Sequence, residues 1–228
     1  MTTDELFAPL AGVPIDDLDL YVVGGAVRDT LLGRKPHDVD YVAVGTTERV
    51  LLDRGFQPVG ADFPVFLHPV SHVEVALART ERKVHAGHTG FTVHADPSVR
   101  LEDDLLRRDF TVNAMALSRT GDLIDPYGGH HDLSSRVLRH VSDAFKEDPL
   151  RVLRGLRFLS QLAEYGFTLA ETTQTLMASM AERLTELSPE RVVTEMDRTL
   201  HAADPCAGLR WLGPLGIGPV LAPALQQI

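Results

Sequence analysis

The sequence predicts an α+β protein in which a small mixed β-sheet with helices is followed by an all-helical region. Two observations predict this fold. Short β-rich runs alternate with turn residues and helical pieces over residues 21–80, whereas helical periodicity dominates from about residue 101 onward. We place the boundary near residue 140, so that residues 1–140 form the first domain and residues 141–228 the second.

Four runs in the first domain are predicted strands, namely Tyr21–Val23, Val39–Val44, Val65–Leu67 and Val73–Leu77. Two helical pieces lie between them, over about 26–32 and 47–54, and each closes on a glycine, as helices commonly do. Later helices are predicted over 102–106, 148–164, 170–185 and 189–201, with a turn at 125–129. Residues 80–93 combine glycines with polar turn residues and are predicted to form a mobile loop.

Composition excludes several classes of protein. The chain has 228 residues, of which 44% are hydrophobic, so it is neither a disordered tail nor a fibrous protein. Its single cysteine, Cys206, excludes an internal disulfide and a thiolate zinc cage. The first 20 residues contain no Lys or Arg, and no apolar run reaches the roughly 18 residues of a membrane span. We therefore expect no signal peptide, no membrane helix and a cytoplasmic location.

The net charge of −10 argues against a nucleic-acid partner, because affinity for phosphate backbones comes largely from Lys and Arg. Basic residues are nevertheless concentrated locally. They form three groups, which are Arg79 and Arg82 with Lys83, Arg107 with Arg108, and Arg151, Arg154 and Arg157. Such groups could bind a few phosphates, but most basic clusters in proteins are solvated surface charges. The motifs around them indicate which interpretation applies.

The first motif is Gly24-Gly25, between a predicted strand and a predicted helix. Paired glycines let a backbone approach a ligand closely, and the start of a helix presents amide groups to phosphate. Arg28, one turn into the helix, adds a charged donor. A simple tight turn explains the glycines equally well.

The second motif is Asp38-Val39-Asp40, which opens a predicted strand. Residues at i and i+2 of a strand point to the same face, so the two carboxylates would lie side by side, at a spacing that suits magnesium. The alternative is a strand edge carrying solvated acids. Glu74, in a later strand, is either a third carboxylate of this site or an outward-facing acid.

The third motif is the helix that begins at Asp148. An acid before Pro149 fits a capping residue followed by proline in the first turn. Leucines at 150, 153, 156 and 159 form an apolar row for packing, and the arginines at 151, 154 and 157 form a parallel row. Capping and packing do not explain the arginine row, which would suit a nucleotide.

Five blocks of the chain carry a family resemblance. They are residues 24–29 with 38–40, 62–69, 107–114, 124–129 and 147–158. In order and spacing they resemble the head and neck regions of bacterial CCA-adding tRNA nucleotidyltransferases, the group that includes bacterial poly(A) polymerases. The resemblance implies a polymerase-β-like nucleotidyltransferase head over 1–140 and a helical neck over 141–228.

The resemblance also implies roles for individual residues. It implies that Asp38 and Asp40 hold catalytic Mg²⁺, and that Gly24, Gly25 and Arg28 contact the triphosphate. It further implies that Arg108 contacts the nucleotide, that Asp109 lies near the ribose hydroxyls, that Asp148 and Arg151 recognise the base, and that Arg154 and Arg157 help to hold the nucleotide. A local ion pair among Arg107, Arg108 and Asp109, opening the helix that contains Asn113, is the alternative for that block.

The expected activity is template-independent, Mg²⁺-dependent addition of C and A, from CTP and ATP, to the 3′ end of tRNA. Addition of CC only, of A only or of poly(A), and transfer to a non-tRNA acceptor, remain open, as does a nucleotide-binding regulatory role. Relatives continue into body and tail regions that clamp tRNA, and some carry a His-Asp phosphohydrolase domain. We expect both to be absent here. The apolar run at 211–217 either caps the neck helices or forms a homodimer surface.

Overall fold

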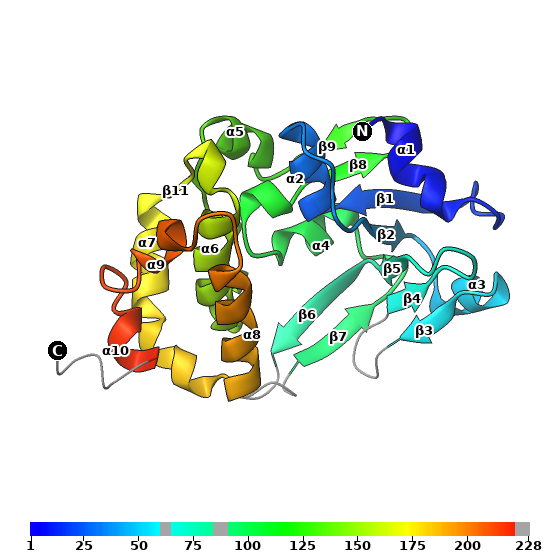
Figure 1. Ribbon diagram of the computed structural model, residues 1–228. Coiled ribbons are helices and arrows are strands. Elements are labelled where there is room, and N and C mark those ends of the chain that lie inside the picture. The colour runs from blue at the N-terminus through cyan, green and yellow to red at the C-terminus, as the bar shows by residue number, and fades with distance from the viewer. Residues whose placement is uncertain (60–64, 84–90, 222–228) are drawn as a thin grey trace. The chain divides into compact units, whose positions relative to one another are not determined.

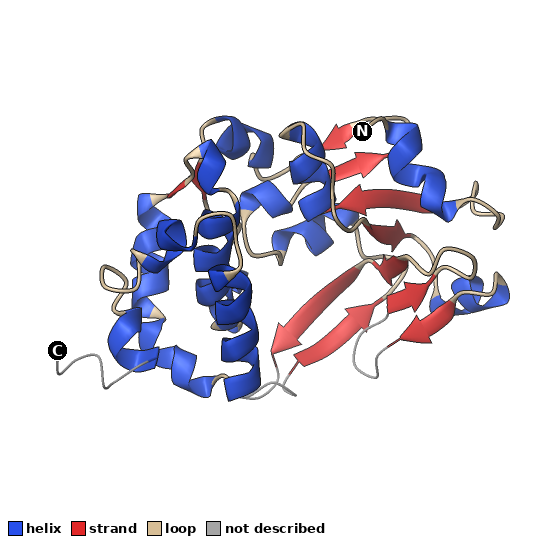
Figure 2. Cartoon of the chain, in the orientation of Figure 1, coloured by secondary structure: helices blue, strands red, loops and turns tan. Residues whose placement is uncertain are grey.

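The computed structural model describes residues 1–59, 65–83 and 91–221, and these residues form two compact units. The first unit holds Met1–Val84 together with Phe91–His130, and the second holds the described chain from His131 onward. Strands are concentrated in the first unit and helices in the second (Figure 2). Part of one sequence block, residues 62–64, lies outside the described residues.

A mixed sheet of seven strands forms the centre of the first unit, in the order β3-β4-β5-β2-β1-β8-β9 (Figure 1). Its strands are β1 (Asp19–Val23), β2 (Asp40–Val44), β3 (Gln57–Val59), β4 (Val65–Leu67), β5 (Glu74–Leu77), β8 (Ala116–Ser118) and β9 (Leu123–Ile124). All neighbours run antiparallel except β2 and β5, which are parallel. The four predicted strands are confirmed, with shifts at their ends.

Apolar side chains of the central strands build the core of this unit. Leu20 and Val22 of β1 are buried, as are Val42 of β2 and Val75 of β5. Tyr41 is also buried, and its hydroxyl donates to the carbonyl oxygen of Leu6 at 2.6 Å. The central strands are therefore fixed by burial as well as by their backbone ladders.

Short helices surround the sheet. They are α1 (Thr3–Phe7), α2 (Gly25–Leu31), α3 (Glu48–Asp53) and α4 (Leu101–Leu106), with the 3₁₀ turns η1 (Ala8–Leu10) and η2 (Thr111–Asn113). The two helices predicted between the first strands are confirmed as α2 and α3. The hydroxyl of Thr47 caps α3, and Gly33 and Gly55 follow the two helices with positive φ.

Two further strands pair with each other rather than with the large sheet. They are β6 (Arg79–Lys83) and β7 (Phe91–Ala95), which run antiparallel, with Arg79 opposite Ala95. The prediction of an irregular loop over 80–93 is therefore wrong at both ends. Glycine and polar residues favoured a loop, but pairing between the two segments satisfies their backbone groups. The middle of the predicted loop lies outside the described residues.

Helices dominate the second unit. They are α6 (Leu150–Gln161), α7 (Glu171–Ser179), α8 (Pro189–Leu200), α9 (Pro205–Leu209) and α10 (Ile217–Leu221), with the 3₁₀ turns η3 (Asp143–Glu147), η4 (Ala163–Tyr165) and η5 (Ala181–Glu186). Another helix, α5 (Gly129–Ser134), spans the junction between the units. One detail differs from an all-helical region, because β10 (Val137–Leu138) pairs in parallel with β11 (Thr168–Leu169).

The leucine row predicted on α6 is confirmed, since Leu150, Leu153, Leu156 and Leu159 are all buried. Helix α9 packs on α6 closely enough that a β-carbon on Gly208 would lie 2.2 Å from the carbonyl oxygen of Leu156. Helices α6 and α9 are thus held at backbone contact distance.

The apolar run near the end of the described chain lies partly inside the second unit. Leu215 and Ile217 are buried, and Trp211 and Leu212 are half-buried. This arrangement agrees with the capping alternative, and the homodimer surface stays a prediction. No helix among the described residues is long and apolar enough to cross a bilayer.

Candidate nucleotide-binding site

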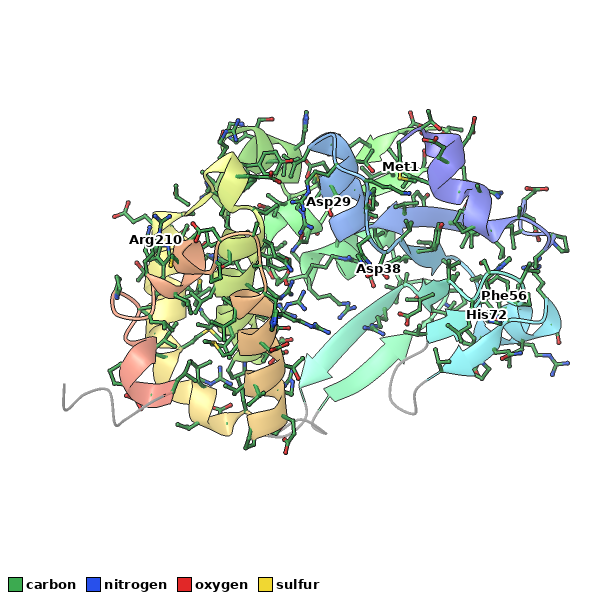
Figure 3. The ribbon with its side chains drawn as sticks, viewed as in Figure 1. Met1, Asp29, Asp38, Phe56, His72 and Arg210 are labelled. Atoms are coloured by element: carbon green, nitrogen blue, oxygen red, sulfur yellow. The ribbon has the colours of Figure 1, made fainter. Side chains whose placement is uncertain are left out.

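Residues of the first two motifs meet at one end of the seven-stranded sheet. Val23, the last residue of β1, pairs with Asp40, the first residue of β2, and also with Ala116 of β8. The Gly24-Gly25 turn therefore begins beside the end of the strand that Asp40 opens. Asp29 on α2 and Asp38 just before β2 can be followed in Figure 3.

Gly24 is required by its backbone conformation and by its neighbours. Its φ of 72° and ψ of −131° lie in a region that other residues avoid. Its amide donates to the carbonyl oxygen of Met115 at 3.2 Å. A β-carbon at this position would lie 2.9 Å from Nη1 of Arg108. The turn thus admits a guanidinium directly against the backbone.

The side chains of Asp38 and Asp40 both reach the surface, but the carboxyl of Asp40 is surrounded by enough protein atoms to be partly desolvated. The strand begins at Asp40, two residues later than predicted, so Asp38 lies just before it, with a carboxylate oxygen 3.1 Å from Nδ1 of His37. Partial desolvation holds the pKa of Asp40 above its ordinary value. The positive charge of Arg108 opposes this rise, and the negative charge of Asp38 adds to it. The two carboxylates therefore repel each other, and their oxygen donors suit a hard divalent cation that would relieve the repulsion.

Glu74 opens β5 at the same end of the sheet. In the parallel register of β2 and β5, Tyr41 lies opposite Val75, so Glu74 is one position ahead, as Asp40 is in β2. Across the three described ranges, no group of three His, Cys, Asp or Glu side chains is arranged to hold a metal ion. The structure therefore does not gather a three-carboxylate cluster, and a metal role for Glu74 stays a prediction.

Asp104 of α4 neutralises the arginine pair. Its side chain is 2% exposed, and its carboxylate lies 3.1 Å from Nη2 of Arg108 and 3.5 Å from Nε of Arg107. It also accepts from the backbone amide of Arg79, the first residue of β6, at 3.3 Å. Both arginines thus pair with Asp104, and the local ion pair with Asp109 that the sequence offered as an alternative stays a prediction.

Arg28, Asn113 and Asp109 form a buried chain of hydrogen bonds, and each is less than 10% exposed. Nη1 of Arg28 donates to Oδ1 of Asn113 at 2.8 Å, and Nδ2 of Asn113 donates to Oδ1 of Asp109 at 3.1 Å. The other side of the guanidinium is held by Asp29, at 2.9 Å. The chain links α2 to the segment around η2.

The predicted base-recognition residues lie at the start of α6 in the second unit. Oδ1 of Asp148 accepts from the amide of Leu150 at 3.0 Å, and Oδ2 pairs with Nη2 of Arg191 on α8 at 3.0 Å. The predicted capping role of Asp148 is therefore confirmed. Nη1 of Arg151 donates to the carbonyl oxygen of Ala144 at 3.1 Å. A carboxylate has about four acceptor positions, so these two contacts do not exhaust Asp148.

The arginine row of α6 is not uniformly exposed. Arg154 is half-buried and lies over the ring of Phe158, with the guanidinium carbon 5.5 Å from the ring centroid. Arg157 is buried, and its Nε lies 2.6 Å from Oε2 of Glu195 on α8. Arg157 therefore joins two helices of the unit, a role that the sequence row did not indicate.

Four residues that the motifs did not indicate hold the candidates in position, namely Asp104, Asn113, Arg191 and Glu195. A signal for the first two was present, because Asp104 and Asn113 each lie four positions from the residue they contact. No local signal existed for Arg191 and Glu195 on α8. Arg191 lies 43 positions from Asp148, and Glu195 lies 38 positions from Arg157.

A mixed sheet with an adjoining glycine turn, acidic pair and guanidinium defines this first unit as a nucleotidyltransferase head of the polymerase-β type. The family model described as "Poly A polymerase head domain" matches residues 20–139. The chain belongs to this family. A second model, described as "Probable RNA and SrmB-binding site of polymerase A", matches residues 166–228.

A curated relative and two solved structures give the same assignment. The chain is 52% identical over 213 residues to the multifunctional CCA protein of Vibrio parahaemolyticus, covering 92% of this chain and 52% of the relative. It matches the Bacillus stearothermophilus CCA-adding enzyme in complex with CTP at 31% identity and a TM-score of 0.77, covering 95% of this chain and 53% of that one.

The second solved structure is the Thermotoga maritima CCA-adding enzyme complexed with tRNA. It matches at 27% identity and a TM-score of 0.70, covering 97% of this chain and 51% of that one. The chain thus spans about half the length of these relatives.

Proposed function

We propose that this chain is the catalytic part of a template-independent RNA nucleotidyltransferase that adds C and A, from CTP and ATP, to the 3′ end of tRNA. The observation that carries the proposal is the meeting of the Gly24 turn, Asp40 and Arg108 at one end of the sheet. Such a site combines carboxylates for a cation with a guanidinium for phosphate. The relatives named for CCA addition and solved with CTP and tRNA support this choice.

In this proposal the head residues bind and orient the triphosphate. Arg108, which lies against Gly24, supplies positive charge beside the turn, and Arg28 supplies it from α2 beside Gly25. Charge-assisted contacts of this kind fix a phosphate more strongly than neutral ones do. Asp109 accepts hydrogen bonds from the ribose hydroxyls and so favours ribonucleotides.

Asp38 and Asp40 are the proposed ligands of a divalent cation, which we propose to be Mg²⁺. When bound, such an ion activates the attacking 3′-hydroxyl and neutralises charge on the α-phosphate and the leaving pyrophosphate. The carboxylates themselves orient the ion and supply compensating charge. Because both side chains reach the surface, we expect the fold to survive their replacement.

Base selection is proposed for the second unit, which we take as a neck over residues 141–228. Cytosine and adenine both present an amino donor beside a ring-nitrogen acceptor, whereas guanine and uracil invert this pattern. Asp148 accepts from the first group and Arg151 donates to the second. A mismatched base would set acceptor against acceptor, so the pair discriminates without a template. Arg154 and Arg157 are retained as residues that help to hold the nucleotide, with Arg157 oriented by Glu195.

The test is incorporation of each of four labelled ribonucleoside triphosphates, with Mg²⁺, into tRNA that ends before CCA, after C or after CC. The inactive control is Asp38→Ala/Asp40→Ala, and the matched control is Asp53→Ala, which removes an exposed acid of α3. The proposal expects CTP and then ATP to be added in order, and Asp53→Ala to keep full activity. Failure to extend any tRNA, while CTP still binds, would overturn it.

Other outcomes would select narrower versions of the activity. Addition of CC only, of A only or of repeated A would identify a specialised enzyme or a poly(A) polymerase. Labelling of an acceptor other than tRNA would identify a different substrate. We also propose a cytoplasmic location. A homodimer through residues 211–217 is a further part of the proposal, and the molar mass from light scattering tests it.

A further inference from the structure

The amide of Asn113 lies between two oppositely charged side chains in the first unit. Its oxygen accepts from Nη1 of Arg28 at 2.8 Å, and its nitrogen donates to Oδ1 of Asp109 at 3.1 Å. A guanidinium can only donate and a carboxylate can only accept, so an amide oriented this way satisfies both. Asn113 is 6% exposed, so water does not easily replace either contact.

Both partners of the amide are themselves held in place. Oδ1 of Asp109 also accepts from the backbone amide of Phe110 at 2.8 Å, so two donors converge on one oxygen and fix the rotation of the carboxylate. Arg28 is anchored on its other side by Asp29. Asn113 and Arg28 are 85 positions apart in the sequence, so this amide is a tertiary link between α2 and the segment around η2.

We propose that Asn113 is a positioning residue that couples the triphosphate end of the nucleotide site to its sugar end. This inference rests on the proposed function, in which Arg28 contacts the triphosphate and Asp109 contacts the ribose. Asn113 touches neither part of the nucleotide. It holds the carboxylate of Asp109 in an orientation that Arg28 sets through the amide. The preference for ribose over deoxyribose therefore depends on Asn113 and Arg28 as well as on Asp109.

The main test replaces the amide by a carboxylate. Asn113→Asp keeps an oxygen for Arg28 but sets a second oxygen against Asp109, whose carboxylate must then turn away. We expect the ratio of the CTP and dCTP association constants to fall by about tenfold, chiefly through weaker binding of CTP, because a hydroxyl is recognised only by a correctly oriented partner. Affinities are measured by calorimetry with Mg²⁺ on the full chain.

Four further variants separate positioning from general damage. Asn113→Asp/Asp109→Asn exchanges amide and carboxylate, restores the hydrogen bond between them, and is expected to recover part of the ribose preference. Arg28→Lys replaces the guanidinium, whose Nη1 donates to the amide, by a shorter ammonium that lacks this group. It is expected to lower the ribose preference in the wild type but not further in Asn113→Leu. Tyr41→Phe, which removes a buried hydrogen bond elsewhere in the unit, is the matched control and should keep the preference.

The outcomes divide clearly. Loss of ribose preference in Asn113→Asp but not in Tyr41→Phe supports the inference. If Asn113→Asp does not fold, the inference is supported when Arg28→Lys lowers the ribose preference of the wild type but not that of Asn113→Leu. Equal weakening of CTP and dCTP, an unchanged ratio, or a wild type without ribose preference overturns it. The readout is binding, so the two proposals can fail separately. If the ribose preference depends on Asn113 but no tRNA is extended, the proposed function is rejected and the role of Asn113 stands.

Discussion

Replacing Asp104 by Asn is expected to destabilise the first unit by about 3 kcal/mol. The side chain of Asp104 is 2% exposed and faces Arg107, Arg108 and the backbone amide of Arg79. Removing one partner of a buried ion pair costs about 3–5 kcal/mol, because the other charge is left uncompensated. The lower end applies, since the side chains of Arg107 and Arg108 remain 18% and 21% exposed and water screens part of the loss.

The effect of Asp104→Asn should also depend on pH. Burial alone would raise the pKa of Asp104, but the charges of Arg108 and Arg107, with hydrogen bonds from Arg108 and from the amide of Arg79, outweigh burial and hold the pKa below its ordinary value. A carboxyl whose pKa is lower in the folded state stabilises the fold above its unfolded pKa of about 3.9. This contribution is lost as pH falls through the folded value.

Urea unfolding followed by circular dichroism, at several pH values, measures both effects. The matched control is Asp103→Asn, which removes the neighbouring and more exposed acid of α4 and should cost less than about 1 kcal/mol. The difference between wild type and Asp104→Asn should be constant near neutral pH and shrink below about pH 4. A loss equal to that of Asp103→Asn, or one that does not shrink in acid, would refute the electrostatic reasoning.

Three further expectations concern packing, a second buried ion pair and the acidic site. Gly208→Ala should lower the stability of the second unit by about 2–3 kcal/mol or disrupt its folding, whereas Gly213→Ala, which meets no atom within 4 Å, should be tolerated; equal melting temperatures would contradict this. Glu195→Gln should destabilise the same unit by about 3 kcal/mol in urea, and a loss below about 1 kcal/mol would show that its arginine partner finds other compensation. Because burial and Asp38 raise the pKa of Asp40, divalent-metal binding measured by calorimetry should weaken on acidification at a higher pH than for an ordinary aspartate, and Arg108→Gln should move this loss to still higher pH.

Local patterns were sufficient to predict much of the first unit. The run Tyr21–Val23 and the run Val65–Leu67 are rich in β-branched and aromatic residues, and both form strands. Gly55 marked the end of α3 because left-handed termination depends only on neighbouring residues. The meeting of the Gly24 turn with Asp40 followed from placing both motifs at strand ends.

Other features depend on contacts between distant segments. Strand β6 was assigned to a loop because its polar sequence shows no strand pattern, and only pairing with β7 makes it regular. The three arginines of α6 were predicted to bind one nucleotide. In the structure, Arg157 forms a buried ion pair with Glu195 on α8. Helical spacing places side chains on a face without indicating which charged group of another segment will meet them.

The sheet order has a consequence for biosynthesis. Every strand of the seven-stranded sheet is drawn from residues between Asp19 and Ile124, and in the part of the chain that the structure describes no later strand is inserted between them. Domains generally fold as units while the ribosome is still adding residues. We therefore expect the ladder that brings Gly24 beside Asp40, and the amide that joins Arg28 to Asp109, to form before α6 has emerged from the ribosome.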